Sequence, residues 1–249
     1  MTKRIALVSG ASRGIGAATA QRLAVDGYSV CVNYLRDRAS AERVVSLIES
    51  KGGEAIAFRA DVSDEQQVVA LFEHIDSKLG RITALINNAG ILLPQIRVEE
   101  MTQSRINTML TTNVTAYFLC CREAIRRMSI RHGGQGGQIV NVSSAASRIG
   151  SGGEYVDYAA SKGAIDTLTI GLANEVAVEG IRVNCVRPGF IYTDMHADGG
   201  EPGRVDRIKH GLPMQRGGRA GEVAAAIAWL ASDESSYSTG TFIEVSGGR

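Results

Sequence analysis

IALVSGASRGIG, residues 5–16, is the stretch that decides the predicted fold. It joins an apolar run of strand length, through a turn rich in glycine, to a helical pattern over residues 17–25. Glycine allows the positive φ of a tight turn, and its missing Cβ lets backbone N–H groups approach a pyrophosphate. The turn indicates a dinucleotide site, with an ordinary strand-to-helix turn as the alternative. Its candidate cofactor contacts are Gly10, Ser12, Arg13, Gly14, Ile15 and Gly16.

Apolar runs and helical patterns alternate along the chain, which is typical of a parallel sheet covered on both faces. The patterns predict strands near residues 4–9, 29–34, 54–59, 82–86, 137–142, 181–186 and 241–245. They predict helices near residues 14–26, 39–51, 64–79, 99–131, 156–179 and 220–231. We therefore expect an α/β fold of Rossmann type, a doubly wound, seven-stranded parallel sheet in a single domain over residues 1–249.

Composition narrows the class of protein. The chain has 249 residues, and 44% of them are hydrophobic, which is enough for one large core. The net charge of +1 and the absence of a Lys/Arg block argue against nucleic acid or an anionic membrane as a partner. No apolar stretch reaches ~18 residues, so we expect no membrane span, no signal peptide and a cytoplasmic protein. The cysteines and histidines lack metal-ligand spacing, so we expect reduced core thiols and no metal.

A second motif lies far along the chain, where YAASK occupies residues 158–162. Four residues make about one helical turn, so Tyr158 and Lys162 share one helix face. A nearby positive charge lowers a tyrosine pKa toward the working range, which suits the pair to moving a proton on or off an alcohol. Such a pair also occurs on ordinary amphipathic helices, and the rest of the sequence supplies its context.

Six features together resemble the short-chain dehydrogenase/reductase family. They are the glycine turn at residues 9–16, NNAG at residues 87–90, Asn113, Ser144, the Tyr158 and Lys162 pair, and Pro188-Gly189. The resemblance runs from residue 4 to Gly247-Gly248. It is closest to the single-domain type, which includes 3-oxoacyl-acyl-carrier-protein reductases and bacterial glucose dehydrogenases.

The resemblance implies a role for each catalytic residue. Tyr158 would give its proton to a carbonyl oxygen as hydride arrives from the nicotinamide, and Ser144 would stabilise the charge on that oxygen. Lys162 would lower the Tyr158 pKa and bind the nicotinamide ribose, while Asn113 would hold a water that links Lys162 to solvent. Ser143 is the other serine candidate, but alignment of the preceding strand with the family favours Ser144.

VNYLR, residues 32–36, ends the second predicted strand and indicates which nucleotide binds. NAD-binding folds usually place an acid there for the ribose 2′-hydroxyl, and that acid would repel a 2′-phosphate. Tyr34 takes this place, and Arg13 and Arg36 could flank a phosphate, so we predict NADP(H). Two solvated surface arginines are the alternative. The remaining cofactor contacts, most of them by resemblance, are Asn33, Asp61, Val62, Asn87, Ala89, Gly90, Tyr158, Lys162, Pro188, Gly189, Ile191 and Thr193, although Asp61 could equally cap a helix.

Residues 192–216 contain no clear strand and are long for a connection, which is typical of a substrate lid. His196, His210 and Met214 are its candidate substrate contacts, and a passive surface loop is the alternative. Apolar residues on more than one face of the helices near 99–131 and 156–179 predict a homo-oligomer, and the family commonly forms tetramers.

We therefore expect an NADPH-dependent oxidoreductase that transfers a hydride between the nicotinamide and a small carbonyl or secondary alcohol substrate. A 3-ketoacyl thioester and a sugar or polyol are the alternative substrates. The alternative function is a sensor that binds NADP(H) with little turnover. A sensor would need only the glycine turn, so the catalytic residues favour the enzyme.

Overall fold

Seven parallel strands form the central sheet of the computed structural model, which describes residues 3–249. In spatial order they are β3 (Ala55–Arg59), β2 (Tyr28–Tyr34), β1 (Arg4–Val8), β4 (Ala84–Asn87), β5 (Gly137–Val142), β6 (Ile181–Pro188) and β9 (Phe242–Val245). The predicted fold class, a doubly wound seven-stranded parallel sheet, is confirmed. Met1 and Thr2, with which the predicted domain begins, lie outside the described residues.

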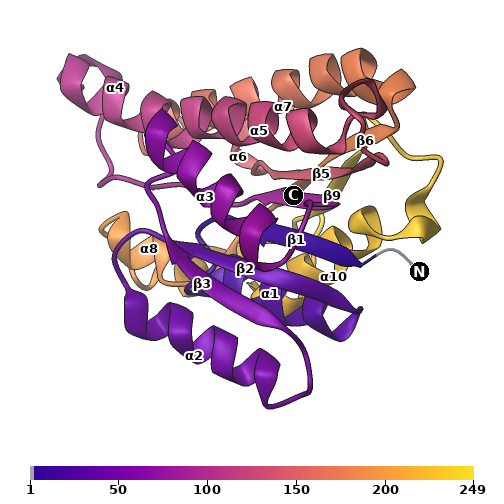
Figure 1. Cartoon of the computed structure of the whole chain (residues 1–249). Coiled ribbons are helices and arrows are strands. Elements are labelled where there is room, and N and C mark those ends of the chain that lie inside the picture. Colours follow the sequence, from indigo (N-terminus) through magenta and orange to yellow (C-terminus); the bar gives the residue numbers. More distant parts are fainter. Residues whose placement is uncertain (1–2) are drawn as a thin grey trace.

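Helices cover both faces of the sheet (Figure 1). One face carries α1 (Gly14–Val25), α2 (Arg38–Glu49) and α10 (Ala220–Ala231). The other face carries α3 (Glu65–Lys78), α5 (Ala116–Met128) and α7 (Val156–Val176). Among the described residues, no helix is long and apolar enough to cross a membrane.

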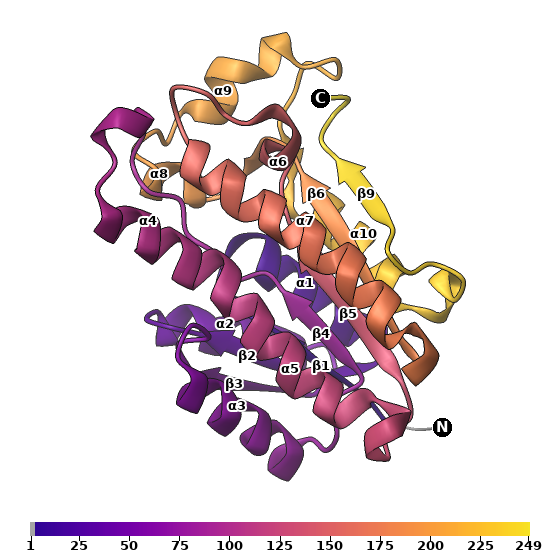
Figure 2. The ribbon, with the colours of Figure 1, turned by 90° about the horizontal axis from the view of Figure 1, so that it is seen from above.

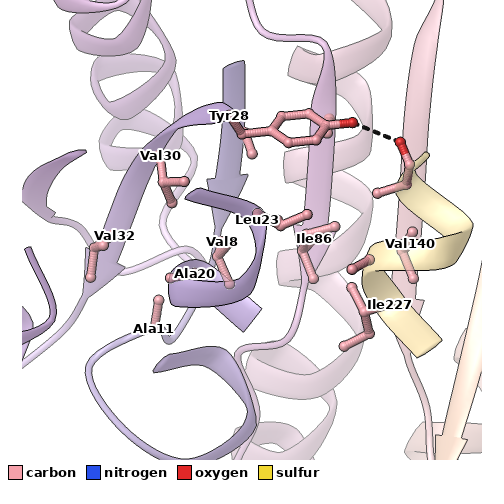
Figure 3. Close-up of a cluster of buried hydrophobic side chains, with 14 of the residues drawn as sticks. Val8, Ala11, Ala20, Leu23, Tyr28, Val30, Val32, Ile86, Val140 and Ile227 are labelled. Carbon is pink, nitrogen blue, oxygen red and sulfur yellow. Dashed lines mark hydrogen bonds between the residues drawn. The ribbon is translucent and has the colours of Figure 1, made fainter. Parts of the chain in front are cut away.

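The strands are apolar on both sides because helices bury both faces of the sheet. In β1, Ala6 and Val8 belong to the cluster under α1 and α10, whereas Ile5 and Leu7 belong to the cluster under α3 and α5. Figure 3 shows the first of these clusters. Its Tyr28 hydroxyl donates a hydrogen bond of 2.7 Å to the carbonyl of Ala231, so this polar atom is paired inside the core.

The order of the strands creates a binding crevice. β1 pairs with β2 on one side and with β4 on the other, so the direction of winding reverses between β1 and β4. In open α/β sheets, such a switch point opens a crevice at the carboxyl ends of the strands. The short helices α6 (Ala146–Ile149), α8 (Met195–Asp198) and α9 (Arg204–Ile208) gather at this end of the sheet (Figure 2).

The single helix predicted over residues 99–131 is wrong. The chain instead forms the 3₁₀ turn η1 (Val98–Glu100), α4 (Gln103–Leu110), the π-helical turn η2 (Thr111–Thr115), α5 and the 3₁₀ turn η3 (Ile130–His132). Thr102 starts α4 because its hydroxyl accepts a hydrogen bond of 3.2 Å from the Arg105 N–H. The π turn joins α4 to α5 with wider hydrogen bonding than an α-helix, a feature frequent at functional sites.

The segment over residues 192–216 is also more regular than a loop. It contains α8, α9 and the 3₁₀ turn η5 (Lys209–Gly211), and the short parallel strands β7 (Ile191–Tyr192) and β8 (Gly218–Arg219) flank it. Two further 3₁₀ turns, η4 (Ala177–Glu179) and η6 (Asp233–Ser235), follow α7 and α10. The other predicted strands and helices lie close to the observed ones.

Candidate active site

The glycine turn between β1 and α1 is shaped for close approach of a ligand to the backbone. Gly10 and Gly14 have φ values of 61° and 57°, which residues with a Cβ rarely adopt. A Cβ on Gly16 would lie 2.5 Å from the Gly10 carbonyl oxygen and 2.6 Å from Nδ2 of Asn88. A Cβ on Gly10 would lie 3.0 Å from Cα of Ala89. A turn with no room for side chains at the start of α1 fits the pyrophosphate of a dinucleotide.

Two asparagines hold this turn in place. Asn33, near the end of β2, accepts a hydrogen bond of 3.3 Å from the Gly10 N–H and donates one of 3.1 Å to the Ala60 carbonyl. Asn88 donates hydrogen bonds of 2.9 Å to the Ser9 carbonyl and 3.1 Å to the Gly10 carbonyl. Asn33 is 2% exposed, so its side chain braces the turn from behind instead of making the cofactor contact predicted for it.

Asn87 was predicted to line the cofactor site, and the structure places it elsewhere. Its side chain is 1% exposed and donates hydrogen bonds to Oδ1 of Asn141 at 3.0 Å and to Sγ of Cys121 at 3.3 Å. Successive side chains of a strand point to opposite faces, so Asn87 faces the core and Asn88 faces the cavity. Asn88 is therefore a site residue that the sequence reasoning missed.

The residues predicted to bind or accommodate the 2′-phosphate differ in their exposure and in their partners. Tyr34 ends β2 and is 8% exposed, because its ring packs in the core cluster. Arg36 is exposed just beyond it. Arg13 is also exposed, but its guanidinium pairs with Asp198 of α8 and lies 3.8 Å from Asp194. The structure thus directs Arg13 toward the segment over residues 192–216.

Asp61 and Val62 follow β3. Oδ1 of Asp61 accepts hydrogen bonds from the backbone N–H of Ser63 at 2.9 Å and from its hydroxyl at 2.6 Å, and Val62 is buried. Asp64, and not Asp61, caps α3 by accepting a hydrogen bond of 3.0 Å from the Gln67 N–H. The helix-cap alternative for Asp61 is therefore wrong, and its carboxylate shapes the turn before α3.

A cavity of about 110 Å³ lies at the carboxyl ends of β4, β5 and β6. Of the predicted site residues, it brings together Ile15, Ser144, Tyr158, Lys162, Pro188, Gly189, Ile191 and Thr193. The segment over residues 192–216 contributes Met195, His196 and Arg204 to the wall, whereas His210 and Met214 are exposed and lie outside it. The cavity therefore joins the glycine turn, the start of α7 and the segment above them.

Tyr158 lies on α7 and lines this cavity. Burial raises the pKa of Tyr158 above its ordinary value of 10.0, and a hydrogen bond with the Ser144 hydroxyl acts in the opposite direction. The Tyr158 pKa is therefore raised in this structure and not lowered as predicted, because desolvation outweighs the contact with Ser144. Tyr158 is a protonated phenol at neutral pH, which is the form that can donate a proton.

Lys162 lies one turn further along α7 and is 3% exposed. Its Nζ donates hydrogen bonds of 2.8 Å to the Val142 carbonyl and 3.3 Å to the Tyr117 hydroxyl. The same atom lies 5.7 Å from the centroid of the Tyr158 ring. Burial lowers the pKa of Lys162 to about 8, so the ammonium is still mostly charged at neutral pH. A buried cation thus stands beside the phenol.

Asn113 lies in the π turn η2 and is fully buried. Its Oδ1 accepts a hydrogen bond of 2.8 Å from the Ile91 N–H, and its Nδ2 donates one of 3.0 Å to the Ile91 carbonyl. A Cβ on Gly90 would lie 3.3 Å from Oδ1 of Asn113 and 3.7 Å from Nζ of Lys162. The Asn113 side chain therefore fixes the chain beside Lys162 by binding protein groups at both ends.

The two serines after β5 have different surroundings. Ser143 is 2% exposed, and its hydroxyl donates a hydrogen bond of 3.1 Å to the Lys162 carbonyl. Ser144 is half-buried, accepts a hydrogen bond of 3.1 Å from the Ala146 N–H and contacts the Tyr158 phenol. Only Ser144 combines a place in the cavity wall with a hydroxyl beside Tyr158.

A buried ion pair positions the start of α7, and the sequence reasoning missed it. Nε of Arg105 on α4 lies 2.8 Å from Oδ2 of Asp157, and the two side chains are 13% and 4% exposed. Oδ1 of Asp157 accepts a hydrogen bond of 2.9 Å from the Tyr158 N–H. Asp157 thereby ties the backbone of Tyr158 to α4. The sequence offered one signal for this role, the position of Asp157 directly before Tyr158. Its partner Arg105 lies far away along the chain, so the pair itself could not be predicted.

This arrangement defines an oxidoreductase of the short-chain dehydrogenase/reductase class, and the chain belongs to that family. A family model described as enoyl-(acyl carrier protein) reductase matches residues 10–249. The chain is 64% identical over 245 residues to YgfF, an uncharacterized oxidoreductase of Escherichia coli (strain K12), with 98% of this chain and 99% of the relative covered.

Two further relatives are similar over the whole length. The chain is 38% identical over 248 residues to the 3-oxoacyl-[acyl-carrier-protein] reductase FabG of Staphylococcus aureus (strain Mu50), with 100% of this chain and 98% of the relative covered. A solved short-chain dehydrogenase from Burkholderia cenocepacia J2315 in complex with NADP superposes with a TM-score of 0.90 at 35% identity, covering 99% and 97% of the two chains.

Proposed function

We propose that this protein is an NADPH-dependent oxidoreductase that reduces a carbonyl group to an alcohol, or runs the reverse reaction. One observation carries the proposal: Ser144, Tyr158 and Lys162 line a single cavity beside the glycine turn. The burial that raises the Tyr158 pKa keeps the phenol protonated, which a donor to a carbonyl requires. The electrostatics of the site thus support reduction.

Each residue of the cavity has a distinct chemical task in this proposal. Bound NADPH would supply the hydride from C4 of its nicotinamide. Ser144 would donate a hydrogen bond to the substrate oxygen as negative charge develops there, and Tyr158 would give that oxygen a proton. Lys162 would stabilise the phenolate that remains and hold the nicotinamide ribose. Asn113 would keep the chain around Lys162 in place and take part in proton resupply.

We propose NADP(H) over NAD(H) as the cofactor. Tyr34 ends β2, so the tip of that strand offers no carboxylate to repel a 2′-phosphate. The exposed Arg36 follows it and is free to approach a phosphate, with Arg13 as a second cation from the glycine turn. The NADP complex of the Burkholderia relative supports this preference.

We propose that residues 192–216 form a substrate lid over the cavity. α8 and α9 supply part of the wall, and the cavity of about 110 Å³ is below the roughly 300 to 1,000 Å³ of most ligand pockets. The lid must therefore shift outward when cofactor and substrate enter together. The substrate is a 3-ketoacyl thioester, as the name of the Staphylococcus relative suggests, or a sugar or polyol.

We also propose a cytoplasmic homotetramer. Phe118 on α5 and Ile170 on α7 are 53% and 49% exposed, and apolar side chains of this size on neighbouring helices support packing against a second copy. Other apolar residues of these two helices, such as Ala116, Ile165 and Leu172, lie in the core instead.

The proposed function is tested by following cofactor oxidation with ketoacyl thioesters, aldoses, quinones and simple ketones, each with NADPH and with NADH. We expect reduction of at least one class, with NADPH preferred. If the protein bound NADPH tightly and reduced none of these compounds, the sensor would replace the enzyme. Light scattering that gave a monomer would contradict the tetramer.

A further inference from the structure

Arg204 of α9 occupies an unusual place for a charged side chain. It is 5% exposed and lines the cavity that contains Tyr158. Its guanidinium carbon lies 4.7 Å from the ring centroid of Tyr155 and 5.5 Å from that of Phe190. These rings come from the segment before α7 and the segment after β6. A buried cation between them joins the lid to two other walls of the cavity.

Carboxylates hold Arg204 in this position. It pairs with Glu154, which precedes Tyr155, and with Glu201 at 3.2 Å. Arg207 joins the same two carboxylates, and the arginines keep the pKa of Glu201 as low as about 2 and that of Glu154 below its ordinary value. Both carboxylates are therefore charged at neutral pH. The Tyr155 hydroxyl also donates a hydrogen bond of 3.1 Å to the Gly199 carbonyl, which is a second link between the start of α7 and the segment over residues 192–216.

This wall is poorly suited to a long alkyl chain. An acyl chain that extended past Tyr155 and α9 would have to displace Arg204 and leave its carboxylate partners without their buried cation, which costs free energy. A small polar molecule needs a smaller outward shift of the lid and does not require Arg204 to leave its carboxylate partners. The size and charge of this wall therefore select against substrates with long apolar chains.

His196 of α8 also lines this cavity, and its ring carries an acceptor without a partner. Its Nε2 lies 3.1 Å from the Ile191 carbonyl oxygen and must donate to it, which makes Nδ1 the acceptor in the neutral ring. Burial lowers the pKa of His196, so the ring is neutral at pH near 7. Nδ1 is buried and has no hydrogen-bond partner among residues 3–249. A hydroxyl or amide donor on a ligand would satisfy it.

We propose that the cavity selects small carbonyl compounds that carry a hydroxyl group near the carbonyl, as in hydroxyketones and open-chain sugars. Arg204 excludes longer apolar chains, and Nδ1 of His196 accepts the hydrogen bond from the substrate hydroxyl. Both are specificity-determining residues. This inference rests on the proposed carbonyl reduction and decides between the two substrate classes named for it.

The test compares NADPH-dependent kcat/KM for hydroxyacetone, acetone and methyl hexyl ketone in four proteins. They are the wild type, His196→Gln, Arg204→Met and Arg207→Met. His196→Gln can keep the hydrogen bond to the Ile191 carbonyl while it removes Nδ1. Arg207→Met is the matched control, because Arg207 belongs to the same charge network but its side chain is 53% exposed and lies outside the cavity wall. Thermal unfolding of each variant shows whether the lid substitution also damages the fold.

We expect the wild type to prefer hydroxyacetone over acetone by about tenfold or more. His196→Gln should lower the ratio of kcat/KM for hydroxyacetone to kcat/KM for acetone to about two or less. Arg204→Met should raise the ratio of kcat/KM for methyl hexyl ketone to kcat/KM for acetone about tenfold. Arg207→Met should change neither ratio.

Two other results have distinct meanings. A wild type that reduces all three ketones equally, or variants that change all three in parallel, would overturn the inference and leave carbonyl reduction intact. A wild type that binds NADPH but reduces neither these ketones nor any compound of the wider screen would overturn carbonyl reduction and the inference together.

Discussion

In two places of this site, adjacent residues of the chain have different structural roles. Asn87 faces the core while Asn88 braces the glycine turn, and Ser143 bonds the backbone of Lys162 while Ser144 contacts Tyr158. The sequence marks each pair because each follows an apolar strand. It does not show which member faces the cavity, since a shift of one residue at the end of a strand reverses every side chain. Family resemblance selected Ser144, whereas Asn88 was identified only from its place in the cavity wall and its bonds to the glycine turn.

The arginines at the nucleotide end give the first prediction. Arg36→Ala should weaken NADPH binding and leave NADH binding unchanged, because only NADPH carries the 2′-phosphate. Hydrogen bonds to charged groups contribute about 1.5 to 3 kcal/mol, so the loss is about tenfold and at most about a hundredfold at this exposed position. Arg13→Ala should have a smaller effect, because Arg13 already pairs with Asp198. Fluorescence titrations with both cofactors measure these affinities.

Arg38→Ala is the control for this series. Arg38 is an exposed arginine two positions further along, but Nε of Arg38 pairs with Glu42 on its own helix at 2.6 Å. Its substitution should leave both affinities unchanged. If Arg36→Ala weakened NADH and NADPH binding equally, Arg36 would not contact the phosphate.

At the scale of elements, helix boundaries depend on contacts that the local pattern does not contain. The hydrophobic pattern over residues 99–131 is continuous and predicts one helix. Thr102 caps a new helix inside that range, and Asn113 sits in a π turn held by its bonds to Ile91. These bonds come from the loop after β4, so only the folded chain shows why the helix is interrupted there.

The ion pair between α4 and α7 gives the second prediction. Arg105→Ala should destabilise the protein by about 3 to 5 kcal/mol, because it leaves the buried carboxylate of Asp157 without its partner. It should also lower kcat, because Asp157 holds the backbone of Tyr158. Urea unfolding measures the stability. In the control, Arg97→Ala removes an exposed pair with Glu99 and should cost less than about 1 kcal/mol. Equal losses in the two variants would contradict the role given to the buried pair.

At the scale of the whole molecule, the sheet and the position of the proposed lid could be predicted from sequence, whereas the contacts that hold residues 192–216 over the cavity could not. The sheet follows from short apolar runs and helical patterns that alternate in order, each of which is local. Among these contacts, Arg204 pairs with Glu154, which lies fifty residues earlier in the chain. Nothing in the local pattern around either residue indicates this pair. The sequence therefore predicts where the cavity lies, and the structure shows what closes it.

Stability at high pH is the third prediction. Burial raises the pKa of Cys121 and Cys185 from 9.0 to about 12, and it raises those of Cys31 and Cys120 still further. The folded chain keeps these protons above about pH 9 while the unfolded chain releases them, so stability falls by about 1.4 kcal/mol per pH unit for each thiol. Lys162 opposes this between about pH 8 and 10.5, because its pKa is lowered on folding. The gain in stability from this one lysine does not offset the loss from the four thiols.

Urea midpoints measured from about pH 8 to 11, with a phosphine reductant present, check this expectation. The wild-type midpoint should fall steeply above about pH 9. Cys31→Val removes one fully buried thiol. The urea midpoint of this variant should therefore fall less steeply with pH, by the contribution of one titrating group. A wild-type midpoint that stayed level to pH 11 would contradict the burial of the thiols.

The most direct test of the account is Tyr158→Phe, because it removes one hydroxyl from the cavity and leaves the glycine turn, Lys162 and the other proposed cofactor contacts in place. NADPH oxidation with the best carbonyl substrate and NADPH binding by fluorescence are measured on the same protein. We predict that turnover falls by at least about a hundredfold, the low end of what a positioned acid contributes, while NADPH affinity stays within about threefold. A variant that kept more than about a hundredth of the wild-type rate would show that Tyr158 is not the proton donor.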